Sequence, residues 1–207
     1  LVAVTACGGG ALAPDAPATD APLPWATFTI PPGAHDAEIT GGRDGDPVTG
    51  FMFGARRSFD LALDPSAMYV LTTPTEPEDQ LDWNKLPGFS DCGGIDLAVD
   101  GAMFGWRWRT DLEVVEVTAY ANNAGVHLTP DEPLLTLDAA ALAARTPVHY
   151  ELTREAAQYR FSADGHAATL PRRCTDQPVM LDAWAGELYF GGTSVAPQTI
   201  TATIREH

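Results

Sequence analysis

The chain has 207 residues and a formal net charge of −16, with 45% hydrophobic and 19% charged residues. This length and apolar content suit one globular domain with a sizeable core. The acidic balance argues against a nucleic-acid partner or an anionic membrane surface, because both attract basic protein surfaces. Eleven of the twelve basic residues are arginine, so Lys85 is the only lysine.

The N-terminal segment is typical of an exported bacterial protein. Residues 1–6 are interpreted as the remnant of a signal peptide, and Val4-Thr5-Ala6-Cys7 resembles a lipobox, whose cysteine accepts a diacylglycerol. Residues 7–24 read as a flexible tether. The alternative for Cys7 is an ordinary buried cysteine after an apolar run. We expect a protein anchored by lipid in the bacterial cell envelope or on its exterior, because no other stretch is apolar enough to form a transmembrane helix.

Two cysteines remain in the body of the chain, which we place at residues 25–207 as a single domain. An even pair in an exported protein favours a disulfide between Cys92 and Cys174. A metal or redox role is the alternative, but it lacks a CxxC spacing and a nearby histidine.

Short alternating segments dominate this domain, in chain order at 26–30, 51–54, 58–63, 101–109, 112–120, 148–152, 159–161, 184–190 and 198–205. Residues 72–82 are predicted to be an exposed loop, residues 84–92 a turn with a disulfide anchor, and residues 138–145 the one short helix. So many strands at short spacing predict an all-β fold: a two-sheet antiparallel β-sandwich of the jelly-roll (concanavalin-like) type with one concave face.

The strand at 101–109 is expected to be central. Side chains alternate between the two faces of a strand, so Phe104, Trp106 and Trp108 should point into the core. Arg107 and Arg109 should then lie on the opposite, open face, together with Gly101, Met103 and Gly105.

The order of several motifs resembles the jelly-roll polysaccharide lyases that act on alginate and glucuronan, and the Gly-Phe-Ser-Asp-Cys segment resembles a set of uncharacterised exported bacterial lipoproteins. The motifs that carry the lyase resemblance span roughly residues 58–205, and they are Ser58–Pro65, Lys85–Phe89, Ala102–Arg107, Glu116–Tyr120, Tyr159–Gly165 and Tyr189–Gly192, followed by Ala196-Pro197.

The resemblance implies a catalytic lysine and tyrosine, which Lys85 and Tyr120 match if the protein is active. It also implies a serine, an arginine and a further tyrosine, and these positions hold Gly101, Met103 and Thr118. Glycine and methionine can neither neutralise a carboxylate nor transfer a proton. We therefore expect a polysaccharide-binding protein with impaired lyase chemistry.

The predicted ligand-binding residues are Trp83, Lys85, Arg107, Arg109, Glu116, Thr118 and Tyr120. Lys85, Tyr120 and the two arginines are expected to converge on one hollow of the concave sheet. The acidic chain favours a neutral glycan over a polyuronate. The alternatives are an active polysaccharide lyase or glycoside hydrolase, and a structural envelope lipoprotein without a ligand.

No cofactor and no metal site is predicted, because the five histidines show no ligand spacing. Structural calcium on the loop near Asp44 and Asp46 stays open, as is common in such sandwiches. Glu113 and Glu116 do not make a convincing hydrolase pair, because residues three apart face opposite sides of a strand. We expect a monomer with a polysaccharide as its partner.

Overall fold

The computed structural model describes residues 24–41, 50–186 and 188–207 as an almost entirely β-stranded domain. The expected signal-peptide remnant 1–6, the lipidated Cys7, nearly all of the tether 7–24 and the loop around Asp44 and Asp46 lie outside the described residues. No helix among the described residues is long and apolar enough to cross a membrane.

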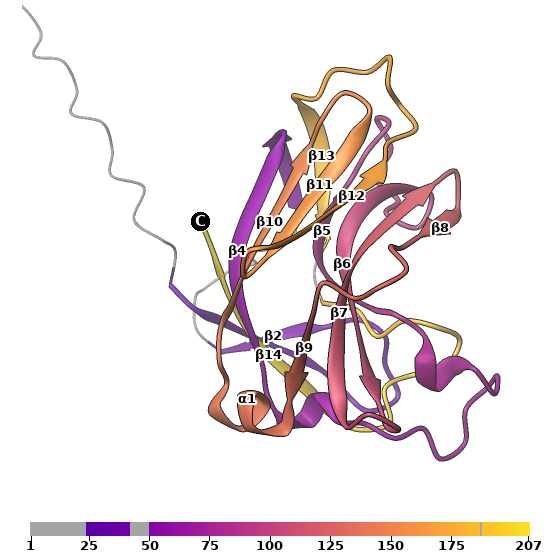
Figure 1. Cartoon of the computed structure of the whole chain (residues 1–207), viewed down its shortest axis with the longest axis vertical. Coiled ribbons are helices and arrows are strands. Elements are labelled where there is room, and N and C mark those ends of the chain that lie inside the picture. Colours follow the sequence, from indigo (N-terminus) through magenta and orange to yellow (C-terminus); the bar gives the residue numbers. More distant parts are fainter. Residues whose placement is uncertain (1–23, 42–49, 187) are drawn as a thin grey trace, which may run out of the picture.

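Two antiparallel sheets of seven strands each form the sandwich, and Figure 1 shows them as two layers. Sheet A has the strand order β12 (His166–Pro171), β11 (Gln158–Ala163), β10 (Val148–Arg154), β4 (Arg56–Leu63), β14 (Ile200–Glu206), β1 (Ala26–Ile30) and β2 (Glu38–Gly41). Sheet B has the order β3 (Gly50–Gly54), β13 (Leu181–Gly186), β5 (Asn84–Ser90), β6 (Asp100–Arg109), β7 (Val114–Asn123) and β8 (Val126–Leu128), and β9 (Leu135–Asp138) pairs with β7. The predicted antiparallel jelly-roll sandwich is therefore confirmed.

The helical content is small, as predicted. The helix α1 (Ala139–Ala144) lies inside the predicted range 138–145, and the Asp138 side chain caps it by accepting a hydrogen bond from the Ala141 N–H. Two short 3-10 turns, η1 (Pro65–Ala67) and η2 (Asp79–Leu81), interrupt the connections. The turn η2 lies in the predicted 72–82 loop, so that loop has a local structure that its composition did not indicate.

The core fills the space between the sheets with rings and branched side chains. Phe104 and Trp106 of β6 are fully buried in it, as their alternation predicts, and Trp108 is 7% exposed. Phe104 contacts Tyr150 of β10 and Phe161 of β11 at centroid distances of 4.8 and 5.4 Å. Rings of both sheets thus interlock, and each such pair contributes about 0.5–1.5 kcal/mol beyond its buried area.

The segment 84–92 differs from the prediction. We expected a turn in this stretch, which contains Pro87 and Gly88. The structure has the strand β5 there, with an irregular register between Lys85 and Gly88 where it pairs with β6. This bulge accommodates the proline, which has no N–H to donate, and lets the strand continue.

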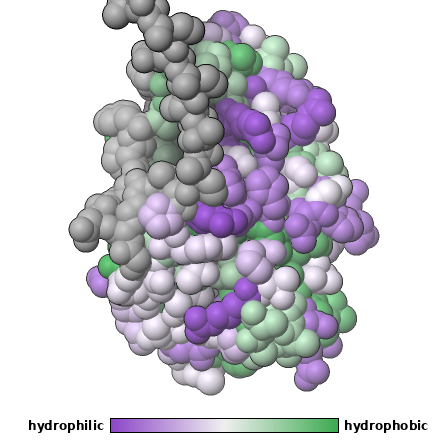
Figure 2. Space-filling view, turned by 90° about the vertical axis from the view of Figure 1, so that its left-hand side faces the viewer, coloured by the Kyte–Doolittle hydropathy of each residue, from purple (hydrophilic) through white to green (hydrophobic). Residues whose placement is uncertain are grey.

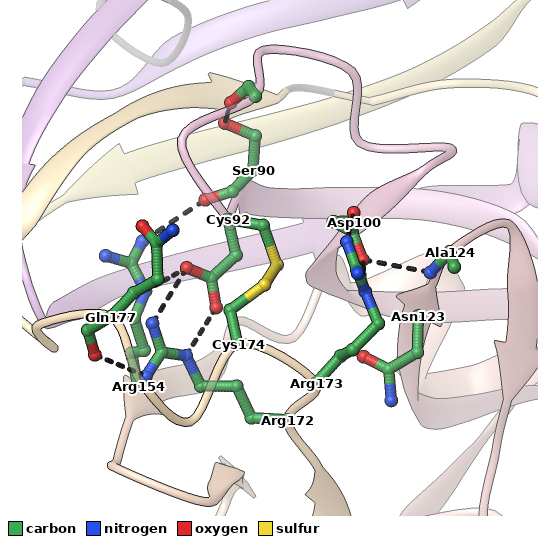
Figure 3. Close-up of a disulfide and its surroundings, with 12 residues drawn as sticks. Ser90, Cys92, Asp100, Asn123, Ala124, Arg154, Arg172, Arg173, Cys174 and Gln177 are labelled. Atoms are coloured by element: carbon green, nitrogen blue, oxygen red, sulfur yellow. Dashed lines mark hydrogen bonds and ion pairs between the residues drawn. A yellow bond between two sulfur atoms is a disulfide. The ribbon is translucent and has the colours of Figure 1, made fainter.

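The disulfide between Cys92 and Cys174 is confirmed, with a Cα–Cα distance of 5.5 Å. It joins the end of β5 to the segment that follows β12, and Figure 3 shows Arg172 and Arg173 beside it. Just before Cys92 the buried Asp91 carboxylate accepts hydrogen bonds from Arg172. The disulfide therefore closes one end of the sandwich over a buried ion pair.

Candidate functional site

A cavity of about 910 Å³ lies on the outer face of sheet B. Its floor includes Met103 of β6 and Tyr120 of β7, which are direct cross-strand partners and alternate with the core side chains of their strands. Its walls come from the start of β5 with the residues just before it (82–86), from the segment 95–98, and from the end of β13 with residues 188–192. Its lining comprises Asp36, Asp82, Trp83, Lys85, Leu86, Ile95, Asp96, Leu97, Ala98, Met103, Tyr120, Asn122, His127, Thr129, Gly186, Leu188, Tyr189, Gly191 and Gly192.

Two glycines allow the Trp83 segment to lie close to the sheet. A Cβ atom at Gly105 would come within 3.3 Å of the Trp83 ring and 3.1 Å of Thr118 Cγ2. A Cβ atom at Gly191 would lie 2.1 Å from the Trp83 carbonyl oxygen, which no real side chain tolerates. The lack of side chains at these positions therefore brings the chain before β5 against β6, where it forms one wall of the cavity.

Lys85 is the cation of the cavity lining. Its Nζ atom lies 3.9 Å from the centroid of the Tyr120 ring and donates a hydrogen bond to the Trp83 carbonyl. The backbone also fixes it, because Lys85 and Tyr189 exchange two hydrogen bonds of 2.8 and 3.0 Å. No carboxylate pairs with it among the residues that the structure describes.

Burial without a paired carboxylate lowers the pKa of Lys85 from 10.5 to about 8, although the negative charge of Asp82 opposes this shift. The ammonium form is disfavoured because the low-polarity surroundings solvate it poorly. Near neutral pH the side chain thus exists in both forms, and it can donate hydrogen bonds as the ammonium or accept a proton as the free amine.

Tyr120 has the opposite tendency. Burial, and then the negative charge of Asp82, raises the pKa of its phenol to about 12. The phenol is therefore protonated at neutral pH and serves as a hydrogen-bond donor rather than as a base. His127 lies beside it at a ring-centroid distance of 5.6 Å, and His127 Nδ1 is 2.6 Å from the side-chain oxygen of Asn122.

Carboxylates outnumber the ammonium in the lining. Asp36, Asp82 and Asp96 all line the cavity together with Lys85. Burial raises the pKa of Asp82, and the nearby charge of Asp79 adds to this effect. An added anion would consequently meet more negative than positive charge.

The two predicted arginines do not reach the cavity, so the expected four-residue convergence is wrong. Arg107 Nε lies 2.8 Å from Glu116 Oε2, and Arg109 Nη1 lies 2.9 Å from Glu116 Oε1. Arg109 also pairs with Asp111 at 2.7 Å. The cause is register: Arg107 and Glu116 are direct cross-strand partners in β6 and β7, so their charges neutralise each other on the sheet surface.

The other predicted ligand-binding residues separate into two groups. Trp83, Lys85 and Tyr120 line the cavity, whereas Thr118 is fully buried beside it and Glu116 is 5% exposed in its ion pairs. The guanidinium carbon of Arg107 lies 4.0 Å from the Trp83 ring centroid, so Arg107 contacts the cavity wall from outside.

Several lining residues were missed by the sequence analysis. Asn122 could have been predicted from the sequence, because it continues the alternation of Thr118 and Tyr120 along β7. Tyr189 and Asp36 come from irregular segments that meet through an isolated bridge, and no periodicity indicates that contact. His127 reaches Tyr120 only because β8 folds back on β7.

Comparisons with known proteins identify no family for this chain. No family model and no curated protein matches the chain. Among solved structures, a glycoside hydrolase family 16 endo-glucanase from Bacteroides ovatus has a TM-score of 0.44 at 11% identity, covering 87% of this chain and 79% of its own. An alginate lyase from Pseudomonas aeruginosa has a TM-score of 0.43 at 12% identity, and the match covers 86% of this chain and 94% of the lyase.

A toad ovary galectin in complex with thio-digalactose is also similar, with a TM-score of 0.34, 8% identity and coverages of 77% and 92%. At these identities and TM-scores, what those proteins bind or cleave carries no weight for this chain.

Proposed function

We propose that this protein binds a neutral polysaccharide in the cavity on sheet B and does not cleave it efficiently. The observation that carries the proposal is the composition of the cavity. It combines the rings of Trp83, Tyr120 and Tyr189 with hydrogen-bonding groups on the outer face of sheet B. Sugars offer apolar faces to aromatic rings and hydroxyl groups to polar side chains, and a few placed polar groups on an apolar lining are typical of such sites.

Charge favours a neutral ligand. Each residue of a polyuronate carries a carboxylate, and this cavity presents three carboxylates against one ammonium. Arg107 and Arg109 add no net attraction, because Glu116 already neutralises part of their charge and Asp111 pairs with Arg109. Carboxylates such as Asp36 and Asp82 instead suit pairs of sugar hydroxyls, which are donors to them.

The two positions that match the lyase serine and arginine also carry no polar side chain. The uronate carboxylate must be neutralised before the neighbouring C–H can lose its proton, and Gly101 and Met103 provide no donor for this. The side chain of Asn122 does not replace them, because its nitrogen donates to the Leu97 carbonyl at 2.6 Å and its oxygen contacts His127.

One observation favours a second candidate function, a residual polysaccharide lyase. The Lys85 amine, with a pKa near 8, lies over a phenol that stays protonated, so a base and an acid are adjacent. A polyuronate panel incubated with the protein tests this activity. Release of unsaturated ends, followed by ultraviolet absorbance and abolished by Lys85→Met, would establish the lyase and overturn the non-catalytic proposal.

The binding proposal is tested by affinity electrophoresis and calorimetry with soluble polysaccharides. The neutral set contains mixed-linkage β-glucan, xyloglucan and galactomannan, and the anionic set contains alginate and glucuronan. We expect binding to at least one neutral polymer, weakened at least tenfold by Tyr189→Ala. The matched control is Phe53→Ala, which removes an exposed ring of β3 that does not line the cavity. Silence across both sets would favour the structural envelope lipoprotein.

We further propose that the domain is exported, anchored through lipid on Cys7 and monomeric. The proposal is supported by the lipobox-like Val4–Cys7 and by the Cys92–Cys174 disulfide, which suits an oxidising compartment. Metabolic labelling with an alkyne fatty acid in a bacterial host tests the anchor, and Cys7→Ser should abolish the label. Light scattering of the lipid-free domain tests the monomer.

A further inference from the structure

A second cluster of polar side chains lies on the outer face of sheet A, on the other side of the core from the cavity. Asp60 of β4 is the direct cross-strand partner of His149 in β10 and of Arg205 in β14. His207 follows β14, and its backbone N–H donates to the Ser58 carbonyl at 2.9 Å. Three adjacent strands therefore bring these side chains together. Figure 2 views the molecule from the side of β4 and the C-terminus, and hydrophilic residues gather in the middle of that face.

Both imidazoles are directed at the Asp60 carboxylate. His149 Nδ1 lies 2.8 Å from Asp60 Oδ1, and His207 Nε2 lies 3.1 Å from Asp60 Oδ2. One ligand atom from each of the three residues lies within 4.8 Å of the other two. A tetrahedral ion with metal–ligand distances of about 2.0–2.1 Å separates its ligands by about 3.3 Å. The two carboxylate–imidazole spacings are thus close to those of a coordination site, and the imidazole of His149 is half-exposed.

We propose that Asp60, His149 and His207 form a surface binding site for a divalent transition-metal ion, such as Zn²⁺, Co²⁺, Ni²⁺ or Cu²⁺. Two imidazole nitrogens and one carboxylate are the donor set that these ions prefer, whereas Ca²⁺ and Mg²⁺ take oxygen ligands. Water would fill the remaining positions, because His149 and His207 are 49% and 29% exposed.

The surroundings of Asp60 suit this role. Arg205 donates to Oδ2, whereas His149 contacts Oδ1. An ion bound through Oδ1 leaves the Arg205 contact in place, and that contact holds the carboxylate in its orientation, as supporting groups do at metal sites.

An ion held by these residues would connect β10, β4 and the end of β14. Because the unfolded chain does not bring the three ligands together, binding would stabilise the folded state and raise the melting temperature with metal concentration. The effect is separate from the cavity on sheet B, so loss of glycan binding and loss of metal binding can be distinguished.

The test uses the full chain after treatment with a chelator. Co²⁺ is titrated while its visible absorption is recorded, Zn²⁺ binding is measured by equilibrium dialysis, and the melting temperature is followed with and without Zn²⁺. The variants are His149→Gln and His207→Gln. The matched control is His166→Gln, an exposed histidine of β12 outside the cluster. Each side chain lies at the surface, and circular dichroism of the metal-free variants checks that they fold.

We expect about one equivalent of ion bound to the wild type and to His166→Gln, with at least tenfold weaker binding to each of the other two variants. The melting temperature of the wild type and of His166→Gln should rise with Zn²⁺, and that of the other two should not. The proposal is overturned if the wild type binds neither ion, or if His149→Gln and His207→Gln bind as tightly as His166→Gln.

Discussion

A charged residue lies near each end of β5, the fully buried Asp91 and the partly buried Lys85, and the surroundings of these two charges differ. Asp91, directly after the strand, is fully buried and lies 2.6 Å from Arg172, 3.4 Å from Arg154 and 2.7 Å from the Tyr159 hydroxyl. Figure 3 shows the arginines gathered at this end beside the disulfide. Lys85, near the start of the strand, has no carboxylate partner among the described residues and lies instead against the face of Tyr120 beside the cavity.

The difference indicates a structural role for Asp91 and a ligand-binding role for Lys85. Burial alone would raise the pKa of Asp91, but hydrogen bonds from Arg172 and Tyr159 outweigh it and lower the pKa. At Lys85 burial also dominates, and only the charge of Asp82 opposes it. A buried charge with its partners in place resists further ligands, whereas a buried charge without one gains from a ligand that supplies hydrogen-bond acceptors.

The largest expected effect on stability is at the Asp91 end of β5, where the buried charge is paired. Asp91→Asn leaves two buried guanidinium groups without their carboxylate, and breaking a buried pair in this way costs about 3–5 kcal/mol. We expect the free energy of unfolding, measured by urea denaturation, to fall by this amount. Asp131→Asn is the control, because Asp131 is exposed, and it should change the value by less than about 0.5 kcal/mol. Equal stabilities of the two variants would show that the Asp91 network contributes nothing.

The disulfide gives the next effect at the same end. Its cysteines are 82 residues apart. In the chain-entropy model, a disulfide that closes a loop of this length stabilises the folded state by about 4 kcal/mol. The variant Cys92→Ser/Cys174→Ser should therefore unfold at lower urea concentration, yet keep its glycan affinity at temperatures where it is folded. Loss of affinity in the folded variant would mean that this end of the molecule shapes the cavity, and the contrast between the two ends would fail.

Lys85→Met should act in the opposite direction and stabilise the protein. The pKa of Lys85 falls from 10.5 to about 8 on folding, so the unfolded state binds more protons between these values and the stability of the wild type rises with pH across that window. Below pH 8 the full cost of the buried charge is present, and methionine removes it. We expect a gain of about 1–3 kcal/mol at pH 7, which shrinks to near zero above pH 10.5.

Urea denaturation at pH 7 and pH 10.5 measures this difference, and glycan titration of the same variant should show weaker binding. A gain in stability with a loss of binding is the expected sign of a residue retained for its ligand. If Lys85→Met is less stable than the wild type at pH 7, the ammonium is well accommodated and the comparison with Asp91 loses its basis.

The sequence predicted the features that depend on local periodicity. Alternation along 101–109 assigned Phe104 and Trp106 to the core and Met103 to the other face, and the structure agrees. Cysteine parity, together with the expected export, predicted the disulfide. These inferences needed no knowledge of which strand lies beside which.

Features that depend on strand register and on distant loops were not predictable in this way. Arg107 was expected to face a ligand, but its partner Glu116 is set by the pairing of β6 with β7. The cluster at Asp60 joins residues 89 and 147 positions apart, because β4 lies between β10 and β14 in sheet A. No spacing rule for histidines relates such residues, since Asp60 and His149 lie on different strands and His207 directly follows a third.

The smallest expected effect is at Arg107, which contacts the cavity wall. It tests whether the charge of Arg107 is neutralised by Glu116, as the charge of Asp91 is by its arginines. Arg107→Ala removes the contact with the Trp83 ring and one partner of Glu116, which keeps Arg109. Cation–π contacts at exposed sites contribute about 0.5–1 kcal/mol and exposed ion pairs less, so we expect a loss of about 1 kcal/mol in the free energy of unfolding. Arg56→Ala is the control, because Arg56 is 58% exposed and pairs with Glu151 away from the cavity.

Because Glu116 already neutralises Arg107, the Arg107→Ala variant should keep the preference for neutral over anionic polysaccharides unchanged. A selective fall in alginate binding, measured by affinity electrophoresis, would instead show that the Arg107 guanidinium attracts the ligand. The ion pair with Glu116 would then not neutralise its charge.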